Sequence, residues 1–420
     1  MGDRKSDPGG FSSRFWDNMT AMENTRQFFA PCPRGLETVL AAELKVLGAS
    51  DIRPTDGGVG FAGDMALCYR ANLGSRIASR ILWKLTERPY RSEEDIYRTA
   101  CALPWPDYFD VGQTFRVKVS AIRCPLRSLD FVTLKIKDAV CDSFRAACND
   151  RPSIDTAAPD MRVYAFLTAD RLMLYLDTSG EALFKRGYRK EQGEAPLREN
   201  LAAGILKLAG WEPGMPLLDP MCGSGTFLIE AALMALNIAP GAERWFAFEK
   251  LKNFDAAAWD RIYRESVAAE RPKEPLPIYG SDVSSTALAA ARANLEAAGL
   301  EGLVAMKQIN MLDIAPPAPA GIIVTNPPYA VRIGEQEALA QLYPKLGDLL
   351  KQKFGGWRAC FFSADMRLPK LIRLSVSRRI PLYNGALECR LFAYEIVAGS
   401  NRKSKNTPGS DGAADQSVPQ

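Results

Sequence analysis

The sequence predicts an α/β protein in two parts, with a mainly parallel sheet in the C-terminal half and a smaller α+β module before it. From about residue 196, helix-like and strand-like segments alternate strictly, which is typical of a parallel sheet covered on both faces. Between residues 27 and 178 the two kinds of segment occur in mixed order, which indicates an α+β module. Near the end, two strand-like runs flank Asn384-Gly385, a strong signal for a terminal antiparallel hairpin.

The N-terminal module divides into short elements by hydrophobic period. Residues 35–48 and 131–147 have the apolar spacing of amphipathic helices. Strand-like pieces are the apolar run QFFAPCP at 27–33, a strand–turn–strand unit at 51–63, an apolar–basic alternation at 114–123 and a hairpin at 161–178.

In the C-terminal half, helices are expected over 201–211, 226–236 and 284–300, the last opened by a Ser cap. The buried strands between and after them are expected at 216–220, 277–282, 304–310, 321–328 and 359–365. The aromatic and charged stretch 237–275 interrupts the alternation, and we interpret it as an insertion folded over the site rather than a sheet element.

The expected domain plan has five segments. It consists of a flexible tail over 1–26, the α+β module over 27–178, a polar linker over 179–195, the parallel-sheet domain over 196–400 and a second flexible tail over 401–420.

The composition restricts the chemistry. The 420 residues are 47% apolar and 24% charged, the N-terminus has no signal-peptide pattern, and no stretch is suited to a membrane span. Nine cysteines without regular spacing indicate reduced thiols in the cytoplasm and no metal site. Histidine is absent, which excludes an imidazole base, a His-activated nucleophile and a His-ligated metal.

Positive charge gathers in one region of the module. Seven Lys or Arg and three Asp lie between residues 116 and 145, an excess equal to the net charge of +4 of the whole chain. A surface facing RNA phosphates and an ordinary solvated helix face both explain it. The candidate RNA contacts in this region are Arg116, Lys118, Arg123 and Lys135.

The segment DPMCGSGT places a carboxylate and two glycines at a strand end. Asp219 ends a buried strand, and Gly223 and Gly225 then turn the chain into a helix. The spacing fits neither a dinucleotide fingerprint nor a P-loop. A carboxylate there repels phosphate, so an adenosyl ligand with an ammonium and a sulfonium fits better; a plain tight turn is the alternative. Cys222 in this turn is expected to be a buried, inert thiol.

Polar residues follow the next two strands. Asp282 is suited to accept from ribose hydroxyls, although a helix N-cap is an equal alternative. Asn310 and Asp313 follow the third strand, and either can meet an adenine amino group or be an ordinary loop residue.

The segment NPPY follows the buried run GIIVT. The amide oxygen of Asn326 and the carbonyl of Pro327 can converge on an amine that has two hydrogens, and prolines add no competing N–H. Tyr329 offers a face on which a flat base can stack. Asn326, Pro327, Pro328 and Tyr329 are therefore the candidate catalytic residues, with a Pro-Pro loop stop as the alternative.

In order, the segments FKRGYRKEQGEAPLRENLAA, DPMCGSGTFLIEAA, IAPGAERWFAFEK, NPPYAVRIGE and NGALEC resemble the THUMP-containing RNA guanine-N2 methyltransferases, most closely the RlmL type that acts on large-subunit ribosomal RNA. The resemblance covers roughly residues 27–398. It implies a class I, Rossmann-like methyltransferase domain that uses S-adenosyl-L-methionine, preceded by a ferredoxin-like segment and an RNA-binding THUMP domain.

The resemblance also assigns roles to residues. The cofactor would be held by Asp219, Pro220, Gly223, Gly225, Thr226, Asp282 and Asn310, with Leu197 and Glu199 closing over it. Arg186, Arg189 and Arg332 would contact RNA. Two departures are Ala330-Val331, where the family often has Gly-Glu, and Asn310, where an Asp is usual.

The resemblance favours N2-methylation of a guanine in structured RNA, with 23S ribosomal RNA as the substrate and one modification rather than two. A tRNA guanine-N2 methyltransferase is the rival within the enzyme class. A protein-glutamine methyltransferase also uses NPPY, but a basic RNA-gripping module argues against it. A non-catalytic RNA-binding assembly factor is the rival from another class.

Overall fold

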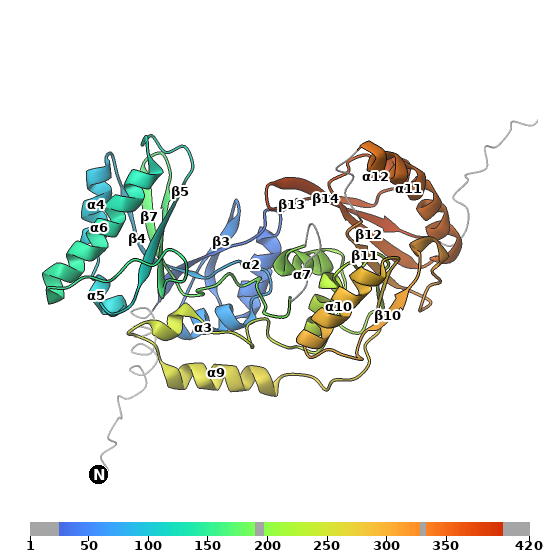
Figure 1. The fold of residues 1–420 in the computed structure, drawn as a ribbon, viewed down its shortest axis with the longest axis horizontal. Coiled ribbons are helices and arrows are strands. Elements are labelled where there is room, and N and C mark those ends of the chain that lie inside the picture. Colours follow the sequence, from blue (N-terminus) through green and yellow to red (C-terminus); the bar gives the residue numbers. More distant parts are fainter. Residues whose placement is uncertain (1–24, 190–196, 328–332, 398–420) are drawn as a thin grey trace, which may run out of the picture.

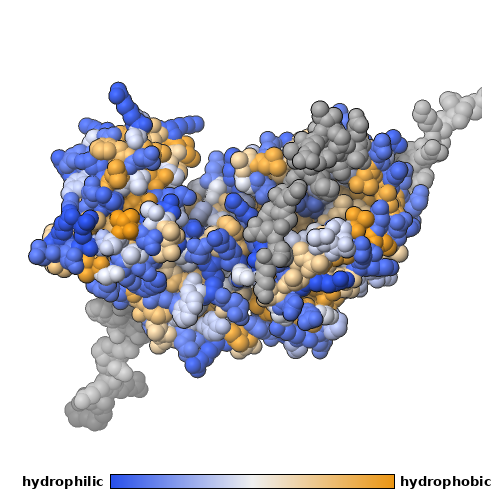
Figure 2. All heavy atoms as spheres, in the orientation of Figure 1, coloured by the Kyte–Doolittle hydropathy of each residue, from blue (hydrophilic) through white to orange (hydrophobic). Residues whose placement is uncertain are grey.

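Two seven-stranded sheets organise the protein, and an elongated molecule results (Figure 1). The computed structural model describes residues 25–189, 197–327 and 333–397. The first sheet has the strand order β2-β3-β1-β4-β7-β6-β5 and the second the order β10-β9-β8-β11-β12-β14-β13. The predicted α/β class is thereby confirmed. Most of the surface in view is hydrophilic, with apolar residues in small separate areas (Figure 2).

The first sheet is mixed. Its strands are β1 (Arg26–Pro31), β2 (Ser50–Thr55), β3 (Gly58–Gly63), β4 (Leu82–Pro89), β5 (Phe115–Ala121), β6 (Met161–Leu167) and β7 (Arg171–Asp177). Its helices are α2 (Glu37–Val46), α3 (Met65–Gly74), α4 (Glu93–Cys101), α5 (Trp105–Tyr108) and α6 (Leu129–Cys148). Strands β5 and β6 are parallel, and all other neighbours are antiparallel. The predicted strand–turn–strand unit is β2–β3, and the predicted hairpin is β6–β7.

The second sheet is mainly parallel. Its strands are β8 (Leu217–Asp219), β9 (Ile278–Asp282), β10 (Ala305–Gln308), β11 (Gly321–Thr325), β12 (Trp357–Ser363), β13 (Arg378–Asn384) and β14 (Leu387–Glu395). Its helices are α7 (Glu199–Leu208), α8 (Thr226–Ala235), α9 (Ala256–Ala268), α10 (Ser285–Ala297), α11 (Ile333–Lys353) and α12 (Leu368–Leu371), with short 3-10 turns η1 (Ala247–Lys250) and η2 (Met311–Asp313). Strands β8 to β12 are parallel, and β13–β14 is the antiparallel hairpin expected at Asn384-Gly385.

The described part of the expected linker, residues 179–189, packs closely against both halves. Arg186 is 5% exposed and lies 3.4 Å from the fully buried carboxylate of Glu230 on α8. Its Nη2 atom also donates to the carbonyl of Arg76 in the first half, at 2.7 Å. Within the expected polar linker, Glu181 and Lys185 are exposed, whereas Arg186 and Tyr188 are buried. Residues 179–189 are called the connector below.

The stretch 237–275 is not part of either sheet, as expected, but its predicted position over the site is wrong. Helix α9 runs beneath α3 of the first half (Figure 1). The ring of Tyr69 on α3 lies 4.5 Å from that of Phe248 and 6.2 Å from that of Trp259. The Tyr69 hydroxyl also accepts from the backbone N–H of Asp255 at 3.0 Å. This insertion holds the second half against the first, because its aromatic side chains pack against apolar side chains of the first half.

The terminal hairpin forms a second joint between the halves. Gly35 has φ +91°, and a Cβ there would lie 2.4 Å from the carbonyl oxygen of Pro381 on β13. The guanidinium of Arg34 lies 4.4 Å over the ring of Tyr383. The largest apolar core contains residues of both sheets, from Phe28 on β1 to Ala393 on β14. The two halves thus share one continuous interior.

Candidate active site

The predicted site residues meet at one edge of the second sheet. Strand β8 lies between β9 and β11, and the chain runs from β8 to β9 and β10 on one side before it returns to β11 on the other. The carboxyl ends of the two strands that flank this reversal carry Asp219 and Asn326. Ligands of open α/β sheets bind at such a switch point, where diverging loops leave room between neighbouring strand ends.

The two glycines of the DPMCGSGT turn have different tasks. Gly223 has φ +52° and Gly225 has φ +81°, so both adopt the left-handed conformation that favours glycine. A Cβ on Gly225 would meet Ala291 of α10 at 3.2 Å, so Gly225 allows close packing. A Cβ on Gly223 would have no atom within 4 Å, so this position faces open space. The backbone at Gly223 can therefore be approached by a ligand.

Asp219 is an unusual carboxylate because it is almost completely buried, at 2% exposure. Desolvation raises its pKa to about 7, while the Thr325 side chain and the Met221 N–H lower it and the charge of Asp282 raises it further. The hydroxyl of Thr325, at the end of β11, is buried next to this carboxyl. No cationic side chain contributes to the pKa shift of Asp219 among the described residues, so this buried carboxylate is suited to a cationic ligand.

Asp282 is held by the backbone around it. Its Oδ2 accepts from the N–H of Gly223 at 3.0 Å and its Oδ1 from the N–H of Ser284 at 2.9 Å. The N-cap of α10 is Ser284, whose hydroxyl accepts from Ala287 at 3.2 Å, so the N-cap alternative for Asp282 is wrong. Each carboxylate oxygen retains a lone pair for a hydroxyl donor, which leaves the ribose prediction open.

Val283 is a candidate site residue that the sequence reasoning missed. Its side chain is 66% exposed, directly after Asp282 at the carboxyl edge of β9. An exposed β-branched apolar side chain at a ligand edge offers a flat apolar base a surface to lie on. The only available signal was its position after the strand-end acid.

Asn310 is placed at the same edge but is already engaged. Its Oδ1 atom accepts from the N–H of Leu312 at 2.9 Å and caps the turn η2, which contains Asp313. The side chain is exposed, so the amide keeps further capacity. The adenine role stays a prediction.

Asn326 and Pro327 directly follow β11, half-buried and buried respectively. Thr325, the last residue of β11, pairs with Phe361 on β12 and brings Asn326 beside the end of β8. The other candidates of this loop, Pro328, Tyr329 and Arg332, lie outside the described residues.

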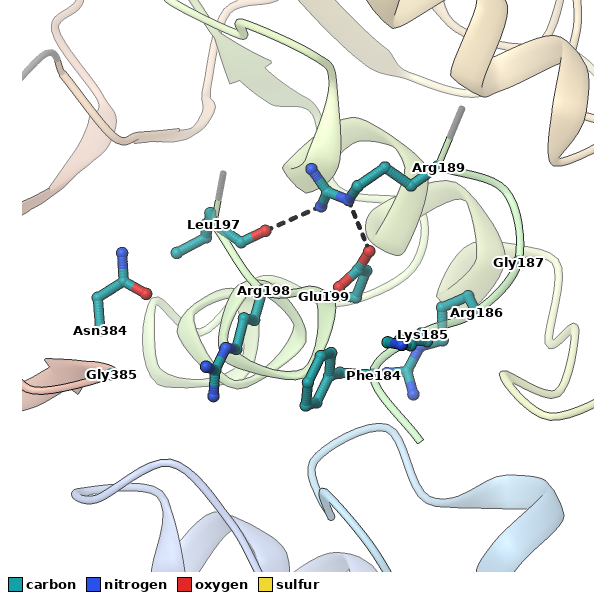
Figure 3. A pocket seen from close by; sticks show the side chains of 10 residues that line it. All are labelled: Phe184, Lys185, Arg186, Gly187, Arg189, Leu197, Arg198, Glu199, Asn384 and Gly385. Carbon is teal, nitrogen blue, oxygen red and sulfur yellow. Dashed lines mark hydrogen bonds and ion pairs between the residues drawn. The ribbon is translucent and has the colours of Figure 1, made fainter. Parts of the chain in front are cut away.

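A cavity of about 590 Å³ contains Leu197 and Glu199 in its lining (Figure 3). Arg189 connects these residues to the turn. Its Nε donates to Glu199 at 2.8 Å, and its Nη2 donates to the carbonyl of Leu197 at 2.9 Å and to the hydroxyl of Thr226 at 3.1 Å. Its Nη1 is buried and has no hydrogen-bond partner among the described residues.

Two of the basic residues expected to contact RNA are internal. Arg186 is buried against Glu230, and the side chain of Arg189 is 11% exposed and ion-paired with Glu199. Arg186 is too deeply buried to reach a phosphate, so its assignment is corrected, whereas the RNA role of Arg189 stays a prediction. Sequence polarity could not reveal this, because their carboxylate partners are 10 and 44 residues away.

The remaining candidate RNA contacts lie on two different faces. Arg116, Lys118 and Arg123 are exposed on β5 and the loop after it. Lys135 lies on α6 and is half-buried, 3.7 Å from Glu94 and over the rings of Tyr97 and Phe131. The basic cluster of the sequence is therefore divided by the fold.

Other groups in the described residues do not form a reactive centre. Cys222 is buried, and burial raises the pKa of its thiol well above the usual range, as expected for an inert thiol. Within the described ranges there is no group of three metal-ligating side chains, and no helix has the length and apolarity to cross a bilayer.

The fold and this edge together define a class I methyltransferase. Residues 186–393 match the RMKL-like methyltransferase domain, residues 27–82 the RlmL ferredoxin-like domain and residues 90–177 the THUMP domain. The chain belongs to this family of THUMP-containing methyltransferases, which confirms the resemblance inferred from its motifs.

Relatives and a solved structure agree with this assignment. A Synechocystis protein named "Putative RNA methyltransferase slr0064" is 40% identical over 90% of this chain and 99% of its own length. The ribosomal RNA large subunit methyltransferase K/L of Shewanella amazonensis is 40% identical over 90% of this chain and 54% of its own. The chain thus spans about half the length of such K/L proteins. The crystal structure described as "SMU.472, a putative methyltransferase complexed with SAH" superimposes with a TM-score of 0.83 at 31% identity, covering 90% of this chain and 100% of that one.

Proposed function

We propose that this protein transfers a methyl group from S-adenosylmethionine to the N2 amine of a guanine in structured RNA, with 23S ribosomal RNA as the substrate. The observation that carries the proposal is the position of Asn326 and Pro327 beside Asp219, at the switch point of the second sheet. Curated relatives named as ribosomal RNA methyltransferases and the THUMP domain support RNA as the substrate.

The residues of the edge fit the cofactor. Asp219 supplies a buried carboxylate for the ammonium group, and Asp282 supplies acceptors for the ribose hydroxyls. Gly223 leaves open space at the backbone, and Val283 offers the adenine an apolar surface. The Nη1 of Arg189, which has no hydrogen-bond partner among the described residues, is a donor for a carboxylate group. When bound, S-adenosylmethionine supplies an electrophilic methyl group on a sulfonium.

Asn326 and Pro327 act on the acceptor. Two oxygens that accept from both hydrogens of an amine draw its lone pair out of conjugation and orient it for an in-line attack. The nitrogen would bond to the methyl carbon as the carbon–sulfur bond breaks and a neutral thioether leaves, and the nitrogen would then lose one proton to solvent. No imidazole is required. Pro328 and Tyr329 complete the proposed acceptor pocket, with the base stacked on Tyr329.

Deletion of the gene followed by mass mapping of ribosomal and transfer RNA tests the proposal. We expect one N2-methylguanine to disappear from 23S ribosomal RNA and to return with the wild-type gene. A loss confined to transfer RNA would correct the substrate. Calorimetry with S-adenosylmethionine serves as the second arm, because no measurable binding would instead favour a non-catalytic RNA-binding factor.

A further inference from the structure

The THUMP half of the first sheet has one face that helices leave uncovered. On β5 and β6 the buried side chains, Phe115, Val117, Met161 and Val163 among them, alternate with exposed or half-exposed ones. The buried set packs toward α6, which contacts β5. The opposite face carries Arg116 and Lys118 on β5 and Arg162 and Tyr164 on β6. Alternation along a strand sends these side chains to one side of the sheet.

This face is unfavourable for the isolated protein. Arg116 on β5 lies directly opposite Arg162 on β6, so two like charges are neighbours on one face of the sheet. Like charges in directly opposed positions destabilise a sheet. The next row contains Lys118 and Tyr164 on β5 and β6, followed in register by Tyr175, which is buried, and Lys84, which is ion-paired with Glu87. Lys118 and Tyr164 are therefore the exposed cation and ring of this row. Such an arrangement of cations and rings is suited to a polyanion with flat bases.

The connector converts the face into a groove. A cavity of about 320 Å³ is bounded by the sheet and by residues 181–185. Five cationic side chains line it, Arg80, Arg116, Lys118, Arg162 and Lys185. Two carboxylates oppose them, because Asp177 binds Arg80 at 2.5 Å and Glu181 binds Lys185 at 2.8 Å and Arg162 at 3.3 Å. Three positive charges therefore remain in excess.

The groove continues toward the active site. Phe184 and Lys185 line both this cavity and the larger one that Leu197 and Glu199 line. There the guanidinium of Arg198 lies 4.9 Å over the ring of Phe184, and Asn384-Gly385 of the terminal hairpin forms the far wall (Figure 3). The two cavities adjoin at Phe184 and Lys185 and together extend from the THUMP sheet to the segment that carries Leu197 and Glu199.

We propose that this path, the cationic groove, holds a single RNA strand by its phosphates and leads it from the THUMP domain to the active site. The inference rests on the proposed function and specifies which surface binds the RNA and in which form. A charged groove combined with aromatic side chains is typical of single-strand binding. A cleft between a sheet and a connector also admits one strand more readily than a double helix.

The test removes two groove cations and two matched cations elsewhere. The groove variant is Arg116→Gln with Lys118→Gln; the control is Arg98→Gln with Arg264→Gln, whose arginines are 72% and 78% exposed on α4 and α9. The probe is a labelled oligouridylate, titrated by fluorescence anisotropy at several salt concentrations. Because each phosphate contact on a single strand contributes about 0.7 to the salt slope, the groove variant should lose about 1.4 and bind about tenfold more weakly. The control should bind as the wild type does.

Equal binding by the groove and control variants would overturn the inference. Tighter binding of a labelled RNA duplex than of the oligouridylate, with the same sensitivity to the groove variant, would overturn the single-strand form. Methylation of ribosomal RNA from a deletion strain distinguishes a failure of the groove inference from a failure of the proposed function. A wild-type protein that methylates no RNA contradicts the proposed function, whereas an active one whose KM is unchanged in the groove variant contradicts only the groove.

Discussion

The two sheets of this protein have the same number of strands but expose different surfaces to ligands, one an edge and the other a face. In the parallel sheet, the candidate site residues Asp219, Asp282 and Asn326 all lie at the edge where the parallel strands end. In the mixed sheet, β5 and β6 leave a whole face uncovered. Parallel strands need crossover helices on both faces, so only their edge is accessible. A sheet with helices on one face can present the other to a polymer.

The difference is useful only if the two sheets keep a fixed relation. Arg186, Asn200 and Arg76 provide this, since each donates from one half to groups of the other. Asn200 donates to the carbonyl of Ile77 at 3.1 Å, and Arg76 donates to that of Ile238 at 2.6 Å. The face proposed to hold RNA is thereby kept at a set distance from the proposed catalytic edge.

The largest expected effect comes from breaking this joint. Glu230→Ala leaves the buried guanidinium of Arg186 without its carboxylate, which costs about 3–5 kcal/mol in the free energy of unfolding. Urea denaturation followed by fluorescence measures it. As the control, Glu94→Ala removes a half-exposed partner of Arg98 and should change the free energy by less than about 1 kcal/mol. Equal changes in the two variants would show that the buried pair does not join the halves.

The next largest effect concerns methyl transfer at the candidate active site. Asn326→Ala removes one of the two proposed acceptors, so the rate of methyl transfer should fall about 10²–10³-fold. Binding of S-adenosylmethionine, measured by calorimetry, should stay within twofold of the wild type. Val46→Ala, at an 88% exposed position, is the control variant, and its methylation rate should equal that of the wild type. A full methylation rate in Asn326→Ala would refute the acceptor pocket.

Proton binding at the edge gives a pH effect. Burial raises the pKa of Asp219 to about 7, so below that pH the carboxyl is mainly protonated and cannot pair with an ammonium. We expect the Kd for S-adenosylmethionine to rise up to about tenfold per pH unit below 7 and to level off above it. Calorimetry from pH 5.5 to 8.5 measures this.

The same shift has a consequence for stability. The folded protein holds a proton on Asp219 between its unfolded and folded pKa values, so this group stabilises the unliganded protein at low pH and loses that contribution as pH rises through about 7. Asp219→Asn should remove both dependences. A wild-type Kd that does not vary with pH would contradict the proposed contact.

The smallest effect tests the exposed apolar residue at the edge. Val283→Ala should weaken cofactor binding by about 1 kcal/mol, roughly fivefold, because a bound adenine would cover two fewer carbon groups. Its free energy of unfolding should not change, since the side chain is 66% exposed without ligand. Val46→Ala is the matched substitution and should change neither quantity. An unchanged Kd in Val283→Ala would remove Val283 from the site.

The sequence by itself determined the local elements and the edge. Period-2 and period-3.6 patterns, the Ser284 cap and the Asn384-Gly385 turn are local properties, so each predicted the element that formed. Asp219, Asp282 and Asn326 came together as expected because the ends of parallel strands share one edge.

Only the tertiary structure decided which charges and rings are internal. The sequence placed Arg186 and Arg189 in a polar linker and residues 237–275 over the site. The fold buried Arg186 against Glu230, paired Arg189 with Glu199 and packed Phe248 of the 237–275 stretch on Tyr69. Lys135 lies on α6, whereas Arg116 and Lys118 lie on the uncovered face of β5 and β6. Long-range pairing decides such questions, because the energy of a charge or an aromatic ring depends on neighbours that are distant in the chain.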